Sequence, residues 1–421
     1  MGVLHTEIAE SDRRAEIDGT ELYPPHNLPD TFTIREHDHE FTFYPKGVDR
    51  FQALLDHIAS ARKSVYCFWF LYEEDEIGVR VKEALIEAAR RGVETRLYID
   101  SFGSGAEDAF FEDFVEAGGH FKQFASLWDK RFLIRNHQKM AIVDRKRVMG
   151  GGFNISNHYF ASPEVDGWCD LGVKMEGPVV ERFNEWYDGI IDFMESDEAD
   201  FTSVRDMVRD WDAGDGPVRL IMGGPTAVSS EWAVRLKEDI ASGERVDLVT
   251  AYFSPPRTMR RVLRKAARHS RLRMILASKS DFAITVLAAR LHYRRLRRSG
   301  AQLFEYQPSK LHMKLMVIDD IVYFGSGNLD MRSIRLNLEL MVRVESAELA
   351  DRMRGLIDDL EAESRPIDKS WFKQYAGWSD RLRWLTSSFM LRFVDYNLSR
   401  RFNLGPSKLK NARRVGKFDY T

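Results

Sequence analysis

Apolar residues recur with two different periods along most of the chain, and the order of these periods repeats. In the first half, a helical period over 51–61 leads to an apolar strand over 64–72. A second helical period over 77–91 leads to a strand over 93–100, and Gly92 suits the C-cap between them. Helices that alternate with largely apolar strands are typical of an α/β fold with buried sheets.

The second half repeats this order. A helical period near 232–241 precedes a strand over 246–253, and a helix over 258–269 precedes a strand over 272–278. In each half, one further helix and strand bring the chain to a His-x-Lys segment. The repeat predicts two pseudo-symmetric α/β lobes, each with a mixed β-sheet flanked by helices.

Breaks in these patterns divide the chain into four parts. Gly214, Gly216 and Pro217 interrupt the periods before a new strand, so we place the boundary between the lobes there. The first residues contain scattered His, Asp and Pro and show little period. The predicted parts are an N-terminal extension (1–46), a first lobe (47–215), a second lobe (216–365) and a basic, aromatic, amphipathic C-terminal segment (366–421).

One short motif occurs in both halves, about 175 residues apart. Both copies read His-x-Lys, four residues, Asp, a short turn and then Gly-small-x-Asn. The recurring residues are His137, Lys139, Asp144 and Asn154 in the first copy, and His312, Lys314, Asp319 and Asn328 in the second.

The residue types of this motif suit a phosphate ligand. Strand alternation places the His and the Lys on one face, so an imidazole and an ammonium can point at the same ligand. The Gly-rich turn allows close backbone approach, and the Asn can donate a hydrogen bond. A lone His is usually a core residue and a lone Gly pair is usually a turn. Two copies at near-equal spacing instead favour phosphoryl transfer without a metal.

The segments around the motifs resemble the phospholipase D superfamily and, within it, the bacterial cardiolipin synthases. The resemblance covers residues 47–360 and is carried by RNHQKMAIVD, GGFNIS, WCDLGVKMEGP, GSGNLDMRS and LNLELMV. It implies two phospholipase D-like lobes with one shared active site at their interface. It also implies that the enzyme uses no cofactor and no metal.

The resemblance further implies a role for each residue. His137 is the expected nucleophile, which becomes a phosphohistidine, and His312 is the expected acid and base, although these duties could be reversed. Each histidine is expected to be oriented by a carboxylate later in its own half, His137 by Asp170 and His312 by Glu339. The alternative is that these carboxylates are merely solvated. The residues expected to bind the phosphate oxygens are Lys139, Lys314, Asn154, Asn328 and Ser326.

Two further features distinguish the copies. Asp144 and Asp319 follow apolar runs, so we expect them to make structural contacts at the far ends of their strands. The second hairpin has one residue fewer in its turn and should be tighter. Gly152 stands where the second copy has Ser326, so any contact of that hydroxyl cannot be symmetric.

Composition and charge add two constraints. Only Cys67 and Cys169 are present, which favours a reducing compartment. The N-terminus lacks an apolar signal core, and no run approaches the roughly 18 to 20 apolar residues that span a bilayer. The net charge of −3 conceals an asymmetry: 366–421 holds 12 Lys plus Arg against 4 Asp, or +8, so the remainder carries −11.

The basic end interleaves aromatic residues with Arg and Lys over 371–402. This composition is typical of an amphipathic helix in an anionic lipid interface, although a helix pair packed on the second lobe would also account for it. Together with the lipid resemblance, it predicts a peripheral enzyme on the cytoplasmic side of the cell membrane. The expected partners are a phospholipid substrate and an anionic membrane surface, with no nucleic acid, and the oligomeric state is open.

The leading hypothesis is a phosphatidyltransferase that joins two phosphatidylglycerols into cardiolipin and releases glycerol. Phosphatidylethanolamine could replace one of these lipids. The alternative is a phospholipase D-type phosphodiesterase that hydrolyses phospholipid or nucleic acid. A membrane-binding scaffold with a vestigial site is disfavoured, because every expected catalytic residue is present.

Overall fold

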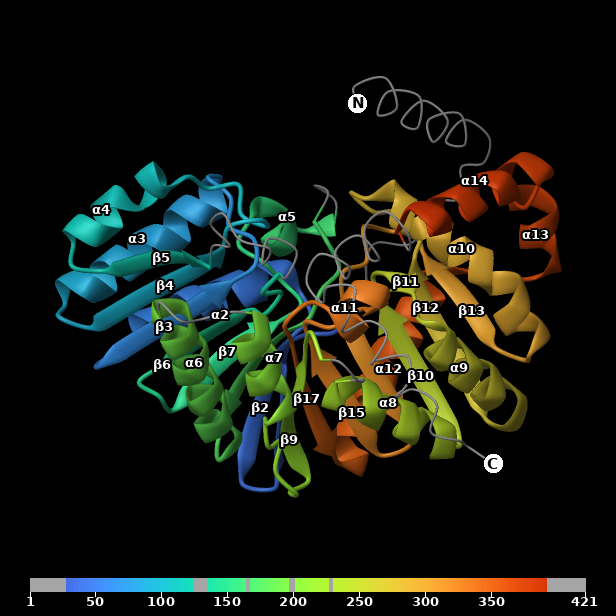
Figure 1. The fold of residues 1–421 in the computed structure, drawn as a ribbon, viewed down its shortest axis with the longest axis horizontal. Helices are drawn as coiled ribbons and strands as arrows, with labels where there is room; N and C mark the ends of the chain where they lie inside the picture. The colour runs from blue at the N-terminus through green and yellow to red at the C-terminus, as the bar shows by residue number, and fades with distance from the viewer. Residues whose placement is uncertain (1–27, 125–134, 164–166, 197–200, 227–229, 392–421) are drawn as a thin grey trace.

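The computed structural model describes residues 28–124, 135–163, 167–196, 201–226 and 230–391 of the 421-residue chain. Two lobes lie side by side, and each is built on an 8-stranded mixed sheet (Figure 1). A 2-stranded sheet accompanies them. The predicted fold class is confirmed.

The first sheet has the order β1-β2-β8-β7-β6-β3-β4-β5. Neighbours among β3, β4 and β5 are parallel, and all other pairs in the sheet are antiparallel. Its strands are β1 (Phe32–Glu36), β2 (His39–Tyr44), β3 (Ser64–Trp69), β4 (Glu94–Asp100), β5 (His120–Phe124), β6 (Met140–Val143), β7 (Arg147–Gly151) and β8 (Gly172–Glu176).

The second sheet repeats this arrangement in the order β18-β13-β12-β10-β14-β15-β17-β9, again with three neighbouring parallel strands, β10, β12 and β13. The 2-stranded sheet pairs β11 with β16. These strands are β9 (Val218–Gly223), β10 (Arg245–Thr250), β11 (Phe253–Ser254), β12 (Arg271–Ala277), β13 (Gln302–Tyr306), β14 (Lys314–Ile318), β15 (Ile321–Gly325), β16 (Leu329–Asp330), β17 (Glu339–Glu345) and β18 (Ser364–Pro366).

Helices cover the sheets in both lobes (Figure 1). The first lobe contains α2 (Gly47–Ala59), α3 (Glu76–Arg90), the 3-10 helix η1 (Asp108–Phe111), α4 (Glu112–Glu116), α5 (Asn157–Phe160) and α6 (Val179–Glu195), with α7 (Phe201–Arg209) before β9. The later helices are α8 (Glu231–Ser242), α9 (Arg257–His269), α10 (Ala283–Arg298), α11 (Met331–Arg335), α12 (Ala347–Ala362), α13 (Lys369–Tyr375) and α14 (Trp378–Phe389).

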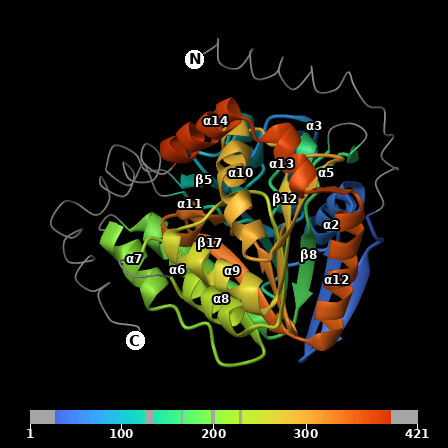
Figure 2. The same cartoon turned by 90° about the vertical axis from the view of Figure 1, so that its right-hand side faces the viewer.

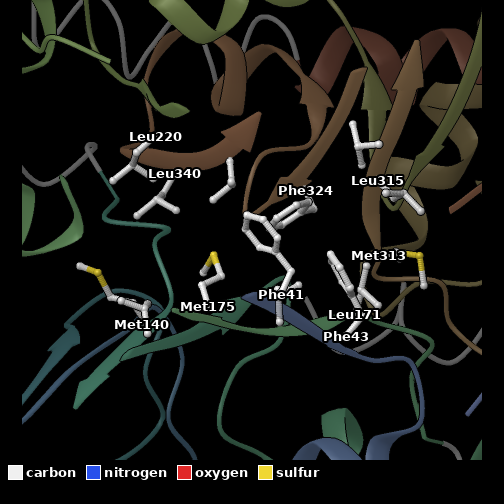
Figure 3. Close-up of a cluster of buried hydrophobic side chains, with 14 of the residues drawn as sticks. Phe41, Phe43, Met140, Leu171, Met175, Leu220, Met313, Leu315, Phe324 and Leu340 are labelled. Carbon is white, nitrogen blue, oxygen red and sulfur yellow. The ribbon is translucent and has the colours of Figure 1, made fainter. Parts of the chain in front are cut away.

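Strand alternation sends side chains to two apolar layers on either side of each sheet. On β3, Val65 and Cys67 face the helices α2 and α3, whereas Tyr66 and Phe68 belong to a cluster that also contains residues of the second sheet. Figure 3 shows this shared cluster between the lobes. The ring of Phe324 on β15 lies 5.3 Å from that of Phe43 on β2. The two lobes therefore bury a common core.

Residues 32–44 fall within the predicted N-terminal extension, but they form β1 and β2 at the edge of the first sheet. Phe41 and Phe43 are fully buried in the core between the lobes. The short turn at His37 and Asp38, both with positive φ, separates two strands rich in polar residues, which hid their period in the sequence. The boundary placed after residue 215 stays a prediction.

The described part of the C-terminal segment forms α13 and α14, which lie over α10 (Figure 2). Trp371 and Trp384 are buried against the second lobe. Part of the aromatic content thus serves packing, as the alternative interpretation predicted. Across the described ranges, no helix is both long and apolar enough to cross a membrane.

Candidate active site

The two His-x-Lys segments lie at the starts of matching strands in the centres of their sheets. The strand β6 begins directly after Lys139, and Lys314 is the first residue of β14. The eight predicted catalytic side chains are all buried, with exposed fractions between 0% and 8%. They are His137, Lys139, Asn154, Asp170, His312, Lys314, Asn328 and Glu339.

His137 takes its carboxylate partner from the other lobe. A parallel backbone bridge joins Asn136 to Leu338, and the N–H of His137 donates to the carbonyl oxygen of Leu338 at 2.9 Å. The next residue on that strand is Glu339, whose Oε2 lies 2.9 Å from Nδ1 of His137. A carboxylate at this distance accepts the Nδ1 proton, so Nε2 is the nitrogen with a lone pair available to a substrate.

His312 is held by the equivalent arrangement, with the roles of the two lobes exchanged. A parallel bridge joins Cys169 to Leu311, and the N–H of His312 donates to the carbonyl oxygen of Cys169 at 2.7 Å. The following residue, Asp170, places Oδ2 2.7 Å from Nδ1 of His312. The buried guanidinium of Arg50 donates to the backbone carbonyl of Asp170 at 2.8 Å and so fixes this strand in turn.

The expected pairing within each half is therefore wrong, because the carboxylates are exchanged between the lobes. Each histidine follows an extended segment that pairs with a strand of the opposite lobe, which brings the next residue of that strand to the imidazole. Neither lobe contains a complete histidine–carboxylate pair, so the site exists only where the two lobes meet.

Two buried ammonium groups lie between these pairs. Nζ of Lys139 donates to the carbonyl oxygen of His137 at 2.5 Å, and Nζ of Lys314 lies 3.0 Å from Nε2 of His312. Burial lowers the pKa of Lys139 to about 7 and that of Lys314 to about 8, although the nearby carboxylates partly offset the effect. Loss of water around these groups thus makes their charged forms costly until an anion binds.

Burial and the same lysines also act on the histidines. The pKa of His137 lies well below its ordinary value, and that of His312 falls to about 4 even though Asp170 opposes the shift. Burial raises the pKa of Glu339 to about 7, whereas His312 and Lys314 outweigh burial at Asp170 and hold its pKa below the ordinary value. These shifts favour the neutral form of both imidazoles, which is the form that a nitrogen nucleophile needs.

The dependence of kcat/KM on pH should reveal the lysines. We expect kcat/KM for a nitrophenyl phosphodiester, whose leaving group needs no proton from His312, to fall as pH rises through about 7 to 8, because each ammonium is present below its pKa and lost above it. Lys139→Arg keeps its charge in this range, so the falling limb should move toward about 8, the value for Lys314. An unchanged limb in the pH profile would show that another group controls it.

The two asparagines are anchored in the same way. Oδ1 of Asn154 accepts the N–H of Leu71 at 3.2 Å, and Oδ1 of Asn328 accepts the N–H of Tyr252 at 3.3 Å. These backbone donors follow the equivalent strands β3 and β10. With both carbonyl oxygens engaged, each amide presents its NH2 group as a donor, and that of Asn154 reaches the hydroxyl of Tyr159 at 2.8 Å. Their contact with phosphate stays a prediction.

The copies differ at the carboxylates. Oγ of Ser326, which we expected to bind the substrate, donates to Oε2 of Glu339 at 2.6 Å. At the matching position, a Cβ on Gly152 would lie only 2.3 Å from Oδ1 of Asp170. The hydroxyl of Ser326 therefore supports the pair of His137 and Glu339, whereas the pair of His312 and Asp170 leaves no room for a side chain at position 152.

This difference gives a paired prediction. Gly152→Ala should push Asp170 away from His312 and lower kcat by about 10²-fold, the lower end of what an acid–base group contributes. Ser326→Ala removes only one neutral donor and should cost about tenfold or less. Steady-state kinetics and thermal melting of both variants test this. Equal losses, or a loss explained by unfolding of Gly152→Ala, would contradict it.

Asp144 and Asp319 are structural, as expected. The carboxylate of Asp144 accepts the N–H of Lys63 at 2.6 Å, and that of Asp319 accepts the N–H of Arg245 at 2.8 Å. Both residues have positive φ, 52° and 48°, in the turns that follow β6 and β14. The turn after β14 has two residues and that after β6 has three, so the second hairpin is the tighter one.

Several aromatic residues of the site escaped the sequence analysis. The ring of Phe70 lies 4.7 Å from that of His137, and the rings of Tyr159 and Trp168 lie 5.1 Å and 5.6 Å from that of His312. In the sequence they are indistinguishable from core residues. Tyr159 and Trp168 also line a pocket of about 610 Å³. Its other lining residues are Leu71, Glu73, Glu74, Asp75, Gly105, Glu107, Ser156, His158, Asp281 and Lys310.

The two-copy arrangement has a match among known families. The family model described as "Cardiolipin synthase, PLD-like domain" matches residues 54–189 and 236–360. The chain belongs to this family. The first matched stretch contains one set of motif residues with Asp170, and the second contains the other set with Glu339, so the PLD-like domain model covers both halves of the composite site.

Individual relatives agree with this PLD-like assignment. Cardiolipin synthase A of Pseudomonas fluorescens is 31% identical over 342 residues, which is 78% of this chain and 70% of the relative. The major cardiolipin synthase ClsA of Bacillus subtilis is 27% identical over 365 residues, 83% of this chain and 74% of the relative. The predicted family and enzyme class, a phospholipase D-type phosphatidyltransferase, are confirmed.

Solved structures agree on the PLD-like fold. Phosphatidylserine synthase of Haemophilus influenzae superposes with a TM-score of 0.65 at 15% identity and covers 93% of this chain and 99% of its own. Polyphosphate kinase of Porphyromonas gingivalis gives a TM-score of 0.51 at 11% identity over 76% of this chain and 50% of its own. At such identities the likeness concerns the fold alone.

Proposed function

We propose that this enzyme joins two phosphatidylglycerols into cardiolipin and releases glycerol, through a covalent phosphohistidine at His137. The observation that carries the proposal is the exchange of carboxylates, which gives two oriented imidazoles around two buried ammonium groups. In-line displacement at phosphorus needs a nucleophile on one side and a proton donor on the other, and two such imidazoles can supply both. The names of the relatives support the choice of product.

In the first half-reaction, Nε2 of His137 attacks the phosphorus of one phosphatidylglycerol. A bond forms from nitrogen to phosphorus, and the bond from phosphorus to the glycerol oxygen breaks. His312 gives its proton to that oxygen, and glycerol leaves. Burial and the neighbouring Lys314 lower the pKa of His312, whereas Asp170 and a bound phosphodiester anion both favour the protonated imidazole that supplies this proton.

In the second half-reaction, a hydroxyl of another phosphatidylglycerol attacks the same phosphorus. His312, now neutral, accepts the hydroxyl proton, and the bond from phosphorus to His137 breaks. Lys139 and Lys314 stabilise the negative charge on the non-bridging oxygens in both transition states. Both histidines return to their starting protonation, so the cycle balances without another reactant.

The same proposal places the enzyme at the cytoplasmic side of the cell membrane as a peripheral protein. Its lipid substrates reside in a bilayer, and the surplus of +8 charges over 366–421 would be attracted to anionic headgroups. We expect no nucleic acid partner, so supercoiled DNA and RNA should be neither bound nor cleaved when they are used as control substrates.

One assay tests the reaction. The full chain is incubated with vesicles that contain labelled phosphatidylglycerol, and the lipids are separated. Labelled cardiolipin with equimolar glycerol is the expected result. Phosphatidic acid alone would show that water is the acceptor and the enzyme is a hydrolase. Absence of both products would overturn the proposed lipid substrate.

A further inference from the structure

The helix α14 exposes apolar side chains where a surface helix ordinarily exposes polar ones. Trp378, Leu382 and Leu385 are 82%, 54% and 56% exposed, and their spacing of four and three residues places them on one face. The opposite face, which packs on the second lobe, buries Trp384 together with the small polar Ser387. Apolar side chains thus lie on the outer face of α14 as well as on the inner one.

The orientation of this helix is fixed by aromatic packing. Trp384 stacks on Trp371 with 6.0 Å between ring centroids. The ring of Trp371 lies 5.7 Å from the ring of Tyr293 on α10. The guanidinium of Arg290 also lies 5.7 Å from the ring of Trp371. A rotation that buried Leu382 and Leu385 would break these contacts, so the outward apolar face is a stable feature of the second lobe.

Exposed apolar residues are concentrated here. In the described part of the chain, nine large apolar side chains are strongly exposed, and five of them lie between 378 and 390. A sixth, Phe282, is 62% exposed and follows Asp281, which lines the pocket beside His312. Single exposed apolar residues are ordinary, whereas a cluster of this kind marks an interaction surface.

The charges around α14 indicate what this surface binds. Arg381 and Arg383 are exposed beside the apolar face, and in the described ranges neither forms an ion pair with an acidic side chain. Apolar and indole side chains flanked by cations are the composition of a helix that lies in an anionic bilayer interface, with the apolar part below the headgroups. A soluble protein partner would need a matching apolar face of its own.

The position of α14 fits a lipid partner. The pocket is lined in part by His158 and Tyr159 of α5. In both views α5, α13 and α14 lie on the upper side of the molecule (Figures 1 and 2). A bilayer that contacts α14 would therefore lie on the same side of the molecule as the α5 residues that line the pocket.

We infer that the outer face of α14, formed by Trp378, Leu382 and Leu385, docks on an anionic phospholipid bilayer and presents the pocket to the headgroups. The choice of lipid as partner rests on the proposed function, because the substrates reside in the bilayer. Docking itself requires no turnover, so it is measurable in a protein that cannot react.

Vesicle binding tests the inference directly. In the His137→Ala background, Leu382→Glu/Leu385→Glu should bind vesicles of phosphatidylcholine and phosphatidylglycerol at least about tenfold more weakly than the parent. Val48→Glu/Val115→Glu, at two exposed valines of the first lobe, is the matched control and should bind as the parent does. Equal binding by the leucine variant and the parent would overturn the inference.

A fluorescent label identifies what covers the helix. Cys67 and Cys169 are buried and the pKa of each thiol is raised to about 12, so a thiol reagent should modify only a cysteine introduced at the surface. An environment-sensitive dye at Leu385→Cys should shift to the blue on addition of vesicles, and one at Val115→Cys should not. A shift already complete without vesicles would mean that a second copy or another part of this chain covers α14, and would overturn docking.

Turnover of short-chain phosphatidylglycerol separates this inference from the proposed reaction. With His137 intact, Leu382→Glu/Leu385→Glu should process dispersed short-chain lipid as fast as the unmodified enzyme and vesicle lipid more slowly. A loss on both substrates alike would contradict a docking role. If neither the unmodified enzyme nor this variant forms product from short-chain lipid, the proposed reaction fails while the vesicle-binding result stands.

Discussion

His137→Ala is expected to lower phosphatidyl transfer by at least about 10³-fold, because in the proposed mechanism this residue forms the covalent intermediate that divides the reaction into two steps. The neighbouring charges and the residues expected to bind phosphate remain in this variant, so lipid binding should change little. The loss should appear in kcat, whereas KM for short-chain lipid stays near its original value. Steady-state kinetics with phosphatidylglycerol measure both.

His312→Ala is the informative partner of this variant. A phosphodiester with a good leaving group, such as nitrophenol, needs no proton donor in the first step. We therefore expect His312→Ala to release nitrophenol once and then stall with the phosphoryl group attached, because no base activates the acceptor alcohol. His137→Ala should show no such burst. A burst in His137→Ala and none in His312→Ala would reverse the roles of the two histidines.

The second large effect concerns the exchanged carboxylates. Glu339→Gln should slow attachment of the phosphoryl group to His137, even with a nitrophenyl substrate, by about 10² to 10⁴-fold, because Glu339 orients the imidazole of the proposed nucleophile. Asp170→Asn should leave that burst largely intact and slow only the transfer to alcohol, because Asp170 orients His312. Burst and steady-state rates of the two variants separate these steps.

Pairing within each half would give the opposite assignment, with Asp170→Asn blocking the burst. Asp351→Asn, at an exposed carboxylate on α12, is a suitable control for loss of charge and should behave as the unmodified enzyme in both phases. Thermal melting of all three variants distinguishes a local change at a histidine from a loss of the fold.

The regular elements were largely predictable because their signals are local. The helix expected over 77–91 is α3, Glu76–Arg90, and the strand expected over 93–100 is β4, Glu94–Asp100. Gly92 between them has a φ of 81°, as a residue just past a helix often does. The apolar period and the cap depend on neighbours within a few residues, and the sequence contains them all.

The composition of the site was predictable for a different reason, since the recurrence of His, Lys and Asn identifies a repeated unit whichever way the lobes pack. The pairing of His137 with Glu339 was not, because the two residues are 202 positions apart and their contact depends on how the lobes meet. Similarly, Trp168 contacts His312 only across the interface and resembles a core residue in the sequence. Local patterns do not specify contacts of this kind.

The most direct test of the composite site is to locate the trapped phosphoryl group. His312→Ala is mixed with labelled nitrophenyl phosphodiester, quenched in alkali, where phosphohistidine persists, and digested for mass spectrometry. In His312→Ala we predict a single modified residue, His137. In His312→Ala/Glu339→Gln we predict no modification within the time of the burst. Two results would contradict a nucleophile that is oriented by the opposite lobe. One is label on any residue other than His137. The other is label that forms as fast in His312→Ala/Glu339→Gln as in His312→Ala.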